Sequence, residues 1–333
     1  MLGDGPVTVA AAGDPQLHWL PDPFVLAPIL VLVVVYVRRF RAVRREGRPG
    51  ERRRPPRGRS PGGEAVYGDR DEGGDPVYHA RHAGDGVEDG DSRLAVRGAG
   101  ALQVTAFAGA VTALLLAVAS PLDRLGEDYL FSAHMLQHVL LGDIAPVLLL
   151  LSLSRVLLRP VTRRLMSVER ALGPLASPVT GIALWIFLMY LWHVPALYEA
   201  AIENPLVHLI EHTSFFSAGI AVWWPLIQPV PMRRRLTGLW TLAYIASAKF
   251  GLAALGLYLT WSGNLLYDYY ADLPRIWGLD PVEDQNAGGA IMMVEQSLTF
   301  VIALVVLFAS MLKQSEADEL RRERLEDAAA ANT

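Results

Sequence analysis

Residues 130–153 read LFSAHMLQHVLLGDIAPVLLLLSL. A helix of roughly 17 to 25 apolar residues crosses the hydrocarbon core of a bilayer, so this stretch is long enough to span it. Its apolar residues are continuous rather than alternating, which favours a helix over a strand of a membrane barrel. The stretch therefore predicts a transmembrane helix, and it carries two histidines, His134 and His138, near its beginning.

Further apolar runs of similar length recur along the chain. Hydrophobic residues make up 52% of its 333 residues, and the charges are concentrated between the runs. This pattern predicts an all-α, polytopic integral membrane protein with seven transmembrane helices. The predicted spans are residues 20–37, 99–119, 130–153, 177–194, 206–228, 239–261 and 289–312.

Arginine and lysine are concentrated in alternate connections between the spans. Arg-rich segments follow the first, third and fifth spans, and Lys313 follows the seventh. Cytoplasmic connections of membrane proteins are enriched in these residues, so the N-terminus is predicted outside and the C-terminus in the cytoplasm. No basic residue precedes the first run and Arg38 closes it, which favours a retained span over a cleavable signal.

The remaining segments are polar. Residues 41–97 contain too few apolar side chains to form a core, which predicts disorder. Their basic half favours contact with anionic lipid over nucleic acid, so the bilayer is an expected partner. The predicted organisation is an extracytoplasmic N-terminus (1–19), a first transmembrane helix (20–37), a disordered cytoplasmic insert (38–97), a six-helix transmembrane core (98–312) and a charged cytoplasmic tail (313–333).

Five of the eight histidines lie in or at the ends of the apolar runs. With the predicted topology, all five fall in the extracytoplasmic third of the bilayer. A single histidine in a span often makes only a hydrogen bond between helices, but five at one depth favour a metal or haem site. These candidate ligands are His134, His138, His193, His208 and His212.

Helical spacing places these histidines in pairs. Residues four apart share one helix face, which joins His134 to His138 and His208 to His212. Asn204 extends the second face outward and Glu211 flanks it as a supporting carboxylate. The sequence contains no cysteine, so a metal must be held by His, Met or carboxylate. Met135 points about 100° away from His134, which favours packing over ligation.

Two further groups of polar residues accompany these runs. Asp284 and Gln285 precede Gly288 and Gly289 at the start of the last span, where glycines permit close backbone approach. This pair is expected close to the histidine helices. Charges deeper in the spans need partners in lipid, and a structural ion pair is favoured over a proton or ion path. The spacing leaves open which carboxylate pairs with the lysine; the three residues are Asp143, Lys249 and Glu295.

Four motifs follow one another between about residue 95 and residue 312. They are His134-Met-Leu-Gln-His138 with Ala145-Pro146, Trp192-His193-Val-Pro195-Ala-Leu-Tyr198, His208 with Glu211-His212, and Asp284-Gln285 before Gly288-Gly289. Together they resemble the CtaG family of caa3-type cytochrome c oxidase assembly factors. The resemblance implies a multi-pass protein of the bacterial plasma membrane that helps copper reach a haem-copper oxidase, with oxidase subunits or a copper chaperone as partners. It implicates the five histidines and the Asp284-Gln285 pair.

Three functions compete on the sequence. A histidine site without cysteine on the outer side suits an assembly factor that handles copper and is not an enzyme. This is the favoured hypothesis. The alternative is a membrane haem protein or haem-modifying enzyme, with axial histidines from facing helices. The third is a zinc metallohydrolase, because His208-Leu-Ile-Glu211-His212 matches the H-x-x-E-H pattern. That pattern does not explain His134, His138 or His193.

Overall fold

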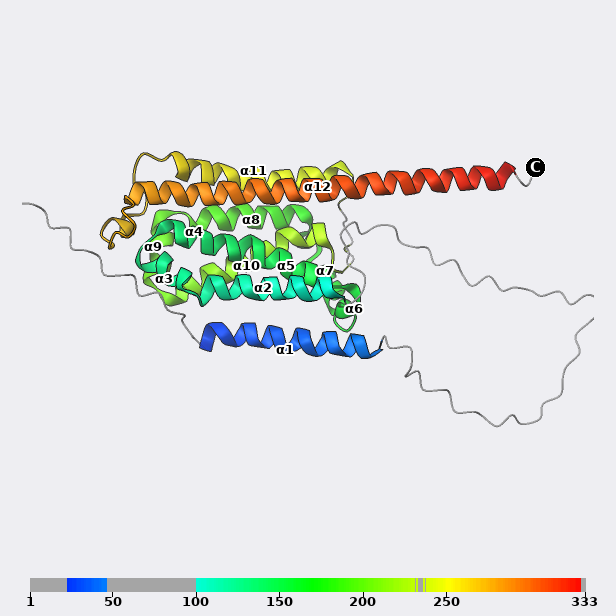
Figure 1. Ribbon diagram of the computed structural model, residues 1–333, viewed down its shortest axis with the longest axis horizontal. Coiled ribbons are helices and arrows are strands. Elements are labelled where there is room, and N and C mark those ends of the chain that lie inside the picture. Colours follow the sequence, from blue (N-terminus) through cyan, green and yellow to red (C-terminus); the bar gives the residue numbers. More distant parts are fainter. Residues whose placement is uncertain (1–22, 47–99, 231, 233–235, 237, 331–333) are drawn as a thin grey trace, which may run out of the picture.

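The computed structural model describes residues 23–46, 100–230, 232, 236 and 238–330. These residues form helices and turns, with no strand among them, so the all-α prediction is confirmed. Most of the longer helices run along a common direction (Figure 1). The elements are α1 (Pro23–Glu46), α2 (Ala101–Val118), α3 (Pro121–Asp128), α4 (Phe131–Val139), η1 (Leu140–Ile144), α5 (Ala145–Ser152), α6 (Arg155–Leu158), α7 (Thr162–Leu172), η2 (Gly173–Ala176), α8 (Pro178–Trp192), α9 (Pro195–Glu203), α10 (Pro205–Ile227), α11 (Leu239–Trp261), η3 (Asp268–Ala271) and α12 (Pro281–Ala330).

Several helices are long and apolar enough to cross a membrane. Four such candidates occur among the described residues, and α7–η2 with α8, bent by 70°, makes a possible fifth. The structure therefore supports a multi-helix membrane protein, while seven spans and the orientation of the termini stay predictions. The four candidates are Ala101–Asp128, Phe131–Ser152, Leu239–Trp261 and Pro281–Asp327.

The remaining predicted spans are helical but less clearly membrane-spanning, for local reasons. Helix α8 has only 15 residues, because Pro178 begins it and the chain turns at His193. Helix α10 has 23 residues, but two histidines and Glu211 make its first half more polar than a lipid-facing helix. The predicted first span, 20–37, begins outside the described residues, and α1 continues past it to Glu46.

The span Phe131–Ser152 contains one turn of π-helix, η1. Pro146 has no N–H and its ring crowds the carbonyl four residues earlier, so the backbone widens at η1. This turn packs against α10 at Gly219, where a Cβ atom would collide with the carbonyl of Gly142. The π-turn also turns Asp143 into the protein interior, where its side chain is fully buried.

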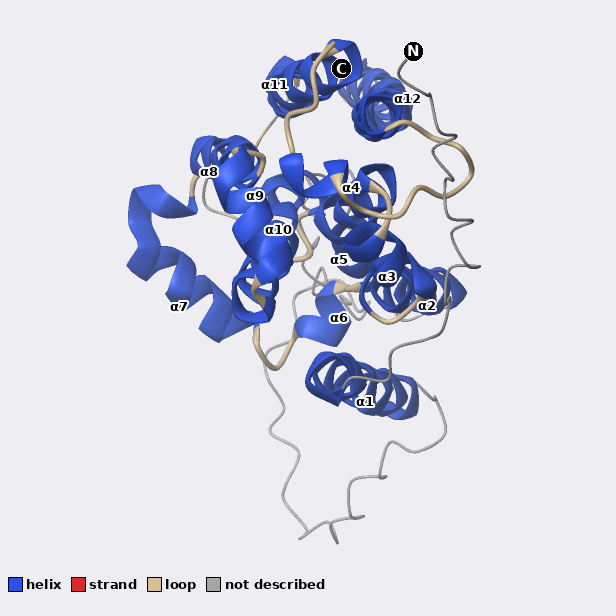
Figure 2. Ribbon diagram, turned by 90° about the vertical axis from the view of Figure 1, so that its left-hand side faces the viewer, coloured by secondary structure: helices blue, strands red, loops and turns tan. Residues whose placement is uncertain are grey.

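One end of the bundle collects the five histidines, and we call it the histidine end. Helices α4 and α10 begin there and α8 ends there. Figure 2 looks along the helices from this end. The short helices α3 and α9 and the loop between α11 and α12 cover this end (Figure 1). The segments that carry the candidate ligands are therefore brought together although they are far apart in the sequence.

The polar segments are only partly described. Helix α12 continues through most of the predicted tail 313–333 and projects beyond the bundle (Figure 1). The predicted N-terminal segment 1–19 lies outside the described residues. The predicted insert 38–97 does so too, apart from the end of α1.

Candidate metal centre

The first pair of histidines lies on α4 in direct contact. The Nε2 atoms of His134 and His138 are 2.8 Å apart, with one ring edge-on to the other. Both side chains are buried. Their spacing of four residues produces this contact, because such residues lie one helical turn apart on the same face.

The second pair lies on α10, which begins at Pro205. Asn204 caps this helix, since its Oδ1 accepts hydrogen bonds from the N–H groups of Leu206 (2.9 Å) and Val207 (3.4 Å). Asn204 thus fixes the start of the helix rather than acting as a ligand. The rings of His208 and His212 follow on one face with centroids 3.9 Å apart.

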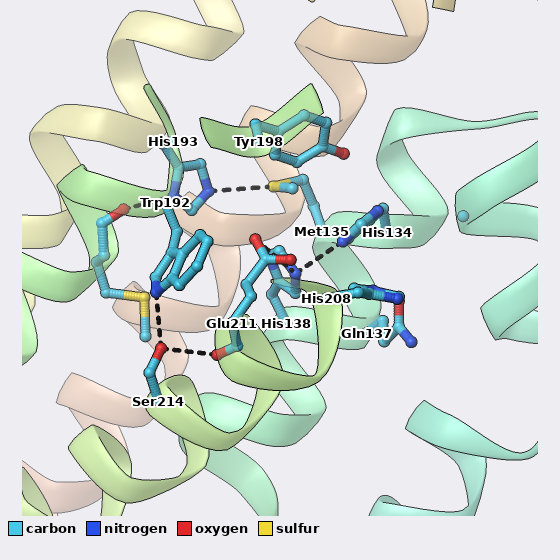
Figure 3. Close-up of polar contacts among 12 residues, drawn as sticks. His134, Met135, Gln137, His138, Trp192, His193, Tyr198, His208, Glu211 and Ser214 are labelled. Atoms are coloured by element: carbon cyan, nitrogen blue, oxygen red, sulfur yellow. Dashed lines mark hydrogen bonds and ion pairs between the residues drawn. The ribbon is translucent and has the colours of Figure 1, made fainter. Parts of the chain in front are cut away.

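Glu211 completes a compact group with these histidines. Ligand atoms of His134, His208, Glu211 and His212 all lie within 4.8 Å of one another. The carboxylate of Glu211 is completely buried, and Figure 3 shows it facing the histidines of α4 and α10. Its Oε1 is 3.6 Å from His138 Nε2, which is too long for a hydrogen bond.

Several polar atoms of this group have no hydrogen-bond partner among the described residues. They include both carboxylate oxygens of Glu211 and the Nε2 atoms of His208 and His212. A buried carboxylate without a partner is costly unless a cation or proton offsets it. Imidazole and carboxylate donors suit copper(II) or zinc, so the residues present fit a bound metal ion.

His193 lies beside the group rather than within it. Its Nδ1 is 2.6 Å from the carbonyl oxygen of Met189, and its Nε2 is 3.4 Å from the Sδ atom of Met135 (Figure 3). The centroids of the His193 and His138 rings are 6.1 Å apart. Met135 therefore contacts a candidate ligand, although the sequence favoured plain packing for it.

Asp284 and Gln285 lie against the histidine helices, but they hold backbone. Asp284 accepts hydrogen bonds from the N–H groups of Phe131 (2.6 Å) and Ser132 (3.2 Å), the first residues of α4. Gln285 accepts from the Leu266 N–H (2.7 Å) in the α11–α12 loop. The pair thus positions the start of the helix that carries His134 and His138.

Replacing Asp284 by alanine should destabilise the protein by about 1–2 kcal/mol, the usual cost of losing a helix cap. The first N–H groups of α4 would lose their acceptor and the favourable charge at the helix N-terminus. We expect a thermal midpoint in detergent lower by several degrees. The exposed Asp272 provides a control as Asp272→Ala; equal midpoints for both variants would contradict the capping role.

Two buried tyrosines of the loop between α11 and α12, Tyr267 and Tyr270, hold this loop against the histidine end. Tyr270 donates to the carbonyl of Gly126 (2.7 Å), and Tyr267 donates to that of His193 (3.0 Å). Burial raises the pKa of both loop hydroxyls well above the ordinary value, so they stay protonated donors. The loop is thereby tied to α3, which contains Gly126, and to His193 at the end of α8.

The structure adds polar contacts near the histidines that the sequence did not predict. The Oε1 of Glu127, on α3, lies 3.0 Å from His208 Nδ1. Gln137 is completely buried and donates to Asp123 (2.6 Å) and to the carbonyl of Ala117 (2.8 Å). Spacing along the chain does not predict these contacts, because α3 is a short polar helix that folds back onto α4.

The three deep charges form a separate buried cluster. Lys249 pairs with Asp143 and also lies 3.4 Å from Glu295. Trp223 donates a hydrogen bond to Asp143, and Thr299 donates to Glu295 (2.6 Å). Lys249 thus contacts both carboxylates, which the sequence had left open.

The fold and this site describe a helical membrane protein with a buried histidine and carboxylate group at one end of its bundle. The cytochrome c oxidase caa3 assembly factor family, Caa3_CtaG, matches residues 91–314. The chain belongs to this family, as the motifs indicated.

Three mycobacterial proteins, each described as uncharacterized, are similar to this chain. An uncharacterized protein of Mycobacterium leprae is 25% identical over 228 residues, which are 61% of this chain and 33% of that protein. Uncharacterized proteins of Mycobacterium bovis and Mycobacterium tuberculosis are each 25% identical over 223 residues, 60% of this chain and 32% of theirs. The matched region of this chain thus covers about a third of each relative. No solved structure matches.

Proposed function

We propose that this protein binds copper at its histidine end and passes it to a haem-copper oxidase during assembly. The observation that carries the proposal is the Glu211 carboxylate, which is buried without a hydrogen-bond partner among the described residues and faces three histidines. A copper ion would offset this charge and be bound by the same imidazoles. Family membership supports the role in oxidase assembly.

Copper is cargo in this proposal, so the protein needs to hold it and release it. Glu211 and the two histidine pairs would bind it, with His193 and Met135 beside them as a second pair of donors. No chemical step is required of these residues, in keeping with an assembly factor rather than an enzyme. The protein would lie in the plasma membrane with its histidine end on the outer side. An oxidase subunit or a copper chaperone would take part in the transfer.

The geometry favours a single ion over haem. Axial ligation would need room for a macrocycle between facing imidazoles. The four ligand groups lie within 4.8 Å of one another, and the centroids of the His134 and His208 rings are 5.5 Å apart. This spacing suits a small ion bound by several side chains.

Elemental analysis and an absorption spectrum of the purified protein test the proposal, with His208→Ala alongside. We expect stoichiometric copper in the unchanged protein and a large loss in the variant. Asp272→Ala serves as a control for handling, since Asp272 is exposed and outside the group. Iron with a Soret band would instead support the haem alternative, and zinc the metallohydrolase; no metal after copper loading would overturn the proposal.

A further inference from the structure

Helix α3 packs closely against α4 beside the candidate centre. Ser120 caps it by accepting a hydrogen bond from the Leu122 N–H (3.1 Å), and Pro121 sets its first turn. Gly126 lies so close to α4 that an added Cβ would approach the His134 backbone to 3.0 Å. Tyr270 also holds the Gly126 carbonyl. The position of the following residue, Glu127, is therefore well defined.

Glu127 connects the surface to the centre. Its side chain is 30% exposed, whereas that of His208 is 11% exposed, and Glu127 Oε1 lies 3.0 Å from His208 Nδ1. Because this contact occupies Nδ1, the other ring nitrogen is left for a ligand. That atom, Nε2 of His208, is buried and has no partner in the described part of the chain.

The neighbouring acidic residues of α3 have other roles. Asp123, one turn earlier, accepts a hydrogen bond from Gln137 and so joins α3 to α4. Asp128 is 44% exposed and pairs with Arg124 on the same helix. Glu127 differs from them because its carboxylate lies 3.0 Å from a ring nitrogen of a candidate ligand, Nδ1 of His208.

We infer that Glu127 is a positioning residue that orients His208. We also infer that it lies on the route by which a cation enters and leaves the centre. A carboxylate on the outer nitrogen of a metal-binding histidine fixes the ring and makes its other nitrogen a stronger donor. The exposed part of the same carboxylate attracts a cation arriving from the histidine end. The inference rests on the proposed function and adds the route by which copper exchanges.

Copper exchange kinetics test this inference. Purified protein is mixed with copper(II), and the copper-loaded protein is then mixed with excess chromophoric chelator, which gives binding and release rates. Loss of the carboxylate in Glu127→Gln should lower copper affinity by about 10- to 100-fold, as outer partners of ligating histidines do. The binding rate should fall as well. Asp128→Asn, one residue away, should match the unchanged protein.

A conservative variant separates charge from position. Glu127→Asp keeps the charge but shortens its reach, so binding should stay faster than in Glu127→Gln while affinity falls through loss of the His208 contact. Thermal midpoints report whether each variant is folded, and a purely structural role would not produce this separation. Wild-type affinity and rates in Glu127→Gln would overturn the inference alone, whereas failure of the unchanged protein to bind copper would overturn the proposed function as well.

Discussion

Replacing Lys249 by methionine is expected to leave very little folded protein. Lys249 is buried between Asp143 and Glu295, and its ammonium lies 5.1 Å from the centre of the Trp223 ring. Without the ammonium, two carboxylates would remain close together with no positive charge beside them. Removing one partner of a buried ion pair typically costs about 3–5 kcal/mol, a large part of the stability of most folded proteins.

The yield of monodisperse protein in detergent and its thermal midpoint measure this effect. The exposed Lys313 provides the control as Lys313→Met, which should behave like the unchanged protein. Neutralising both carboxylates in the same chain, with Asp143→Asn and Glu295→Gln, should restore much of the lost stability because amides need no counter-charge. A single Lys249→Met variant as stable as the unchanged protein would show that the cluster contributes little.

Replacing Glu211 by glutamine should sharply weaken copper binding. The amide fills the same space but removes the one carboxylate of the group and offers a weaker ligand oxygen. We expect copper affinity to fall at least about tenfold, which corresponds to about 1.4 kcal/mol of binding free energy. Competition with a chromophoric chelator measures this change.

Glu203→Gln is the matched control, since Glu203 is an exposed acid at the end of α9. Its affinity should stay at the wild-type value. The same Glu211→Gln variant separates the proposed role from a metallohydrolase, in which a glutamate acts as general base beside the metal. Unchanged metal content in that variant would contradict a ligand role for Glu211 and favour the hydrolase.

Much of the helical framework could be predicted from hydropathy. The predicted runs 130–153 and 239–261 correspond closely to the candidate spans Phe131–Ser152 and Leu239–Trp261. Apolar periodicity does not reveal the π-turn, which depends on how Pro146 meets the preceding backbone. Hydropathy also predicted ordinary spans at α8 and α10. Helix α8 is short, however, and α10 carries Glu211 and two of the histidines.

The candidate site could be predicted only in part, for a similar reason. Four-residue spacing brought His134 to His138 and His208 to His212, because it depends on helix geometry alone. The position of Glu127 depends on how α3 folds back over α4, and no local pattern encodes that contact. Asp284 was expected near the histidines, but its role as a helix cap became clear only with its partners in place.

X-ray absorption spectroscopy of copper-loaded protein tests copper binding by these residues most directly. With stoichiometric copper, the spectrum should show imidazole scattering together with nearby oxygen or nitrogen ligands. The imidazole signal should weaken when His212 is replaced by alanine, because His212 belongs to the ligand group. Copper that lacks imidazole ligands, or an identical spectrum in His212→Ala, would contradict copper binding at this centre.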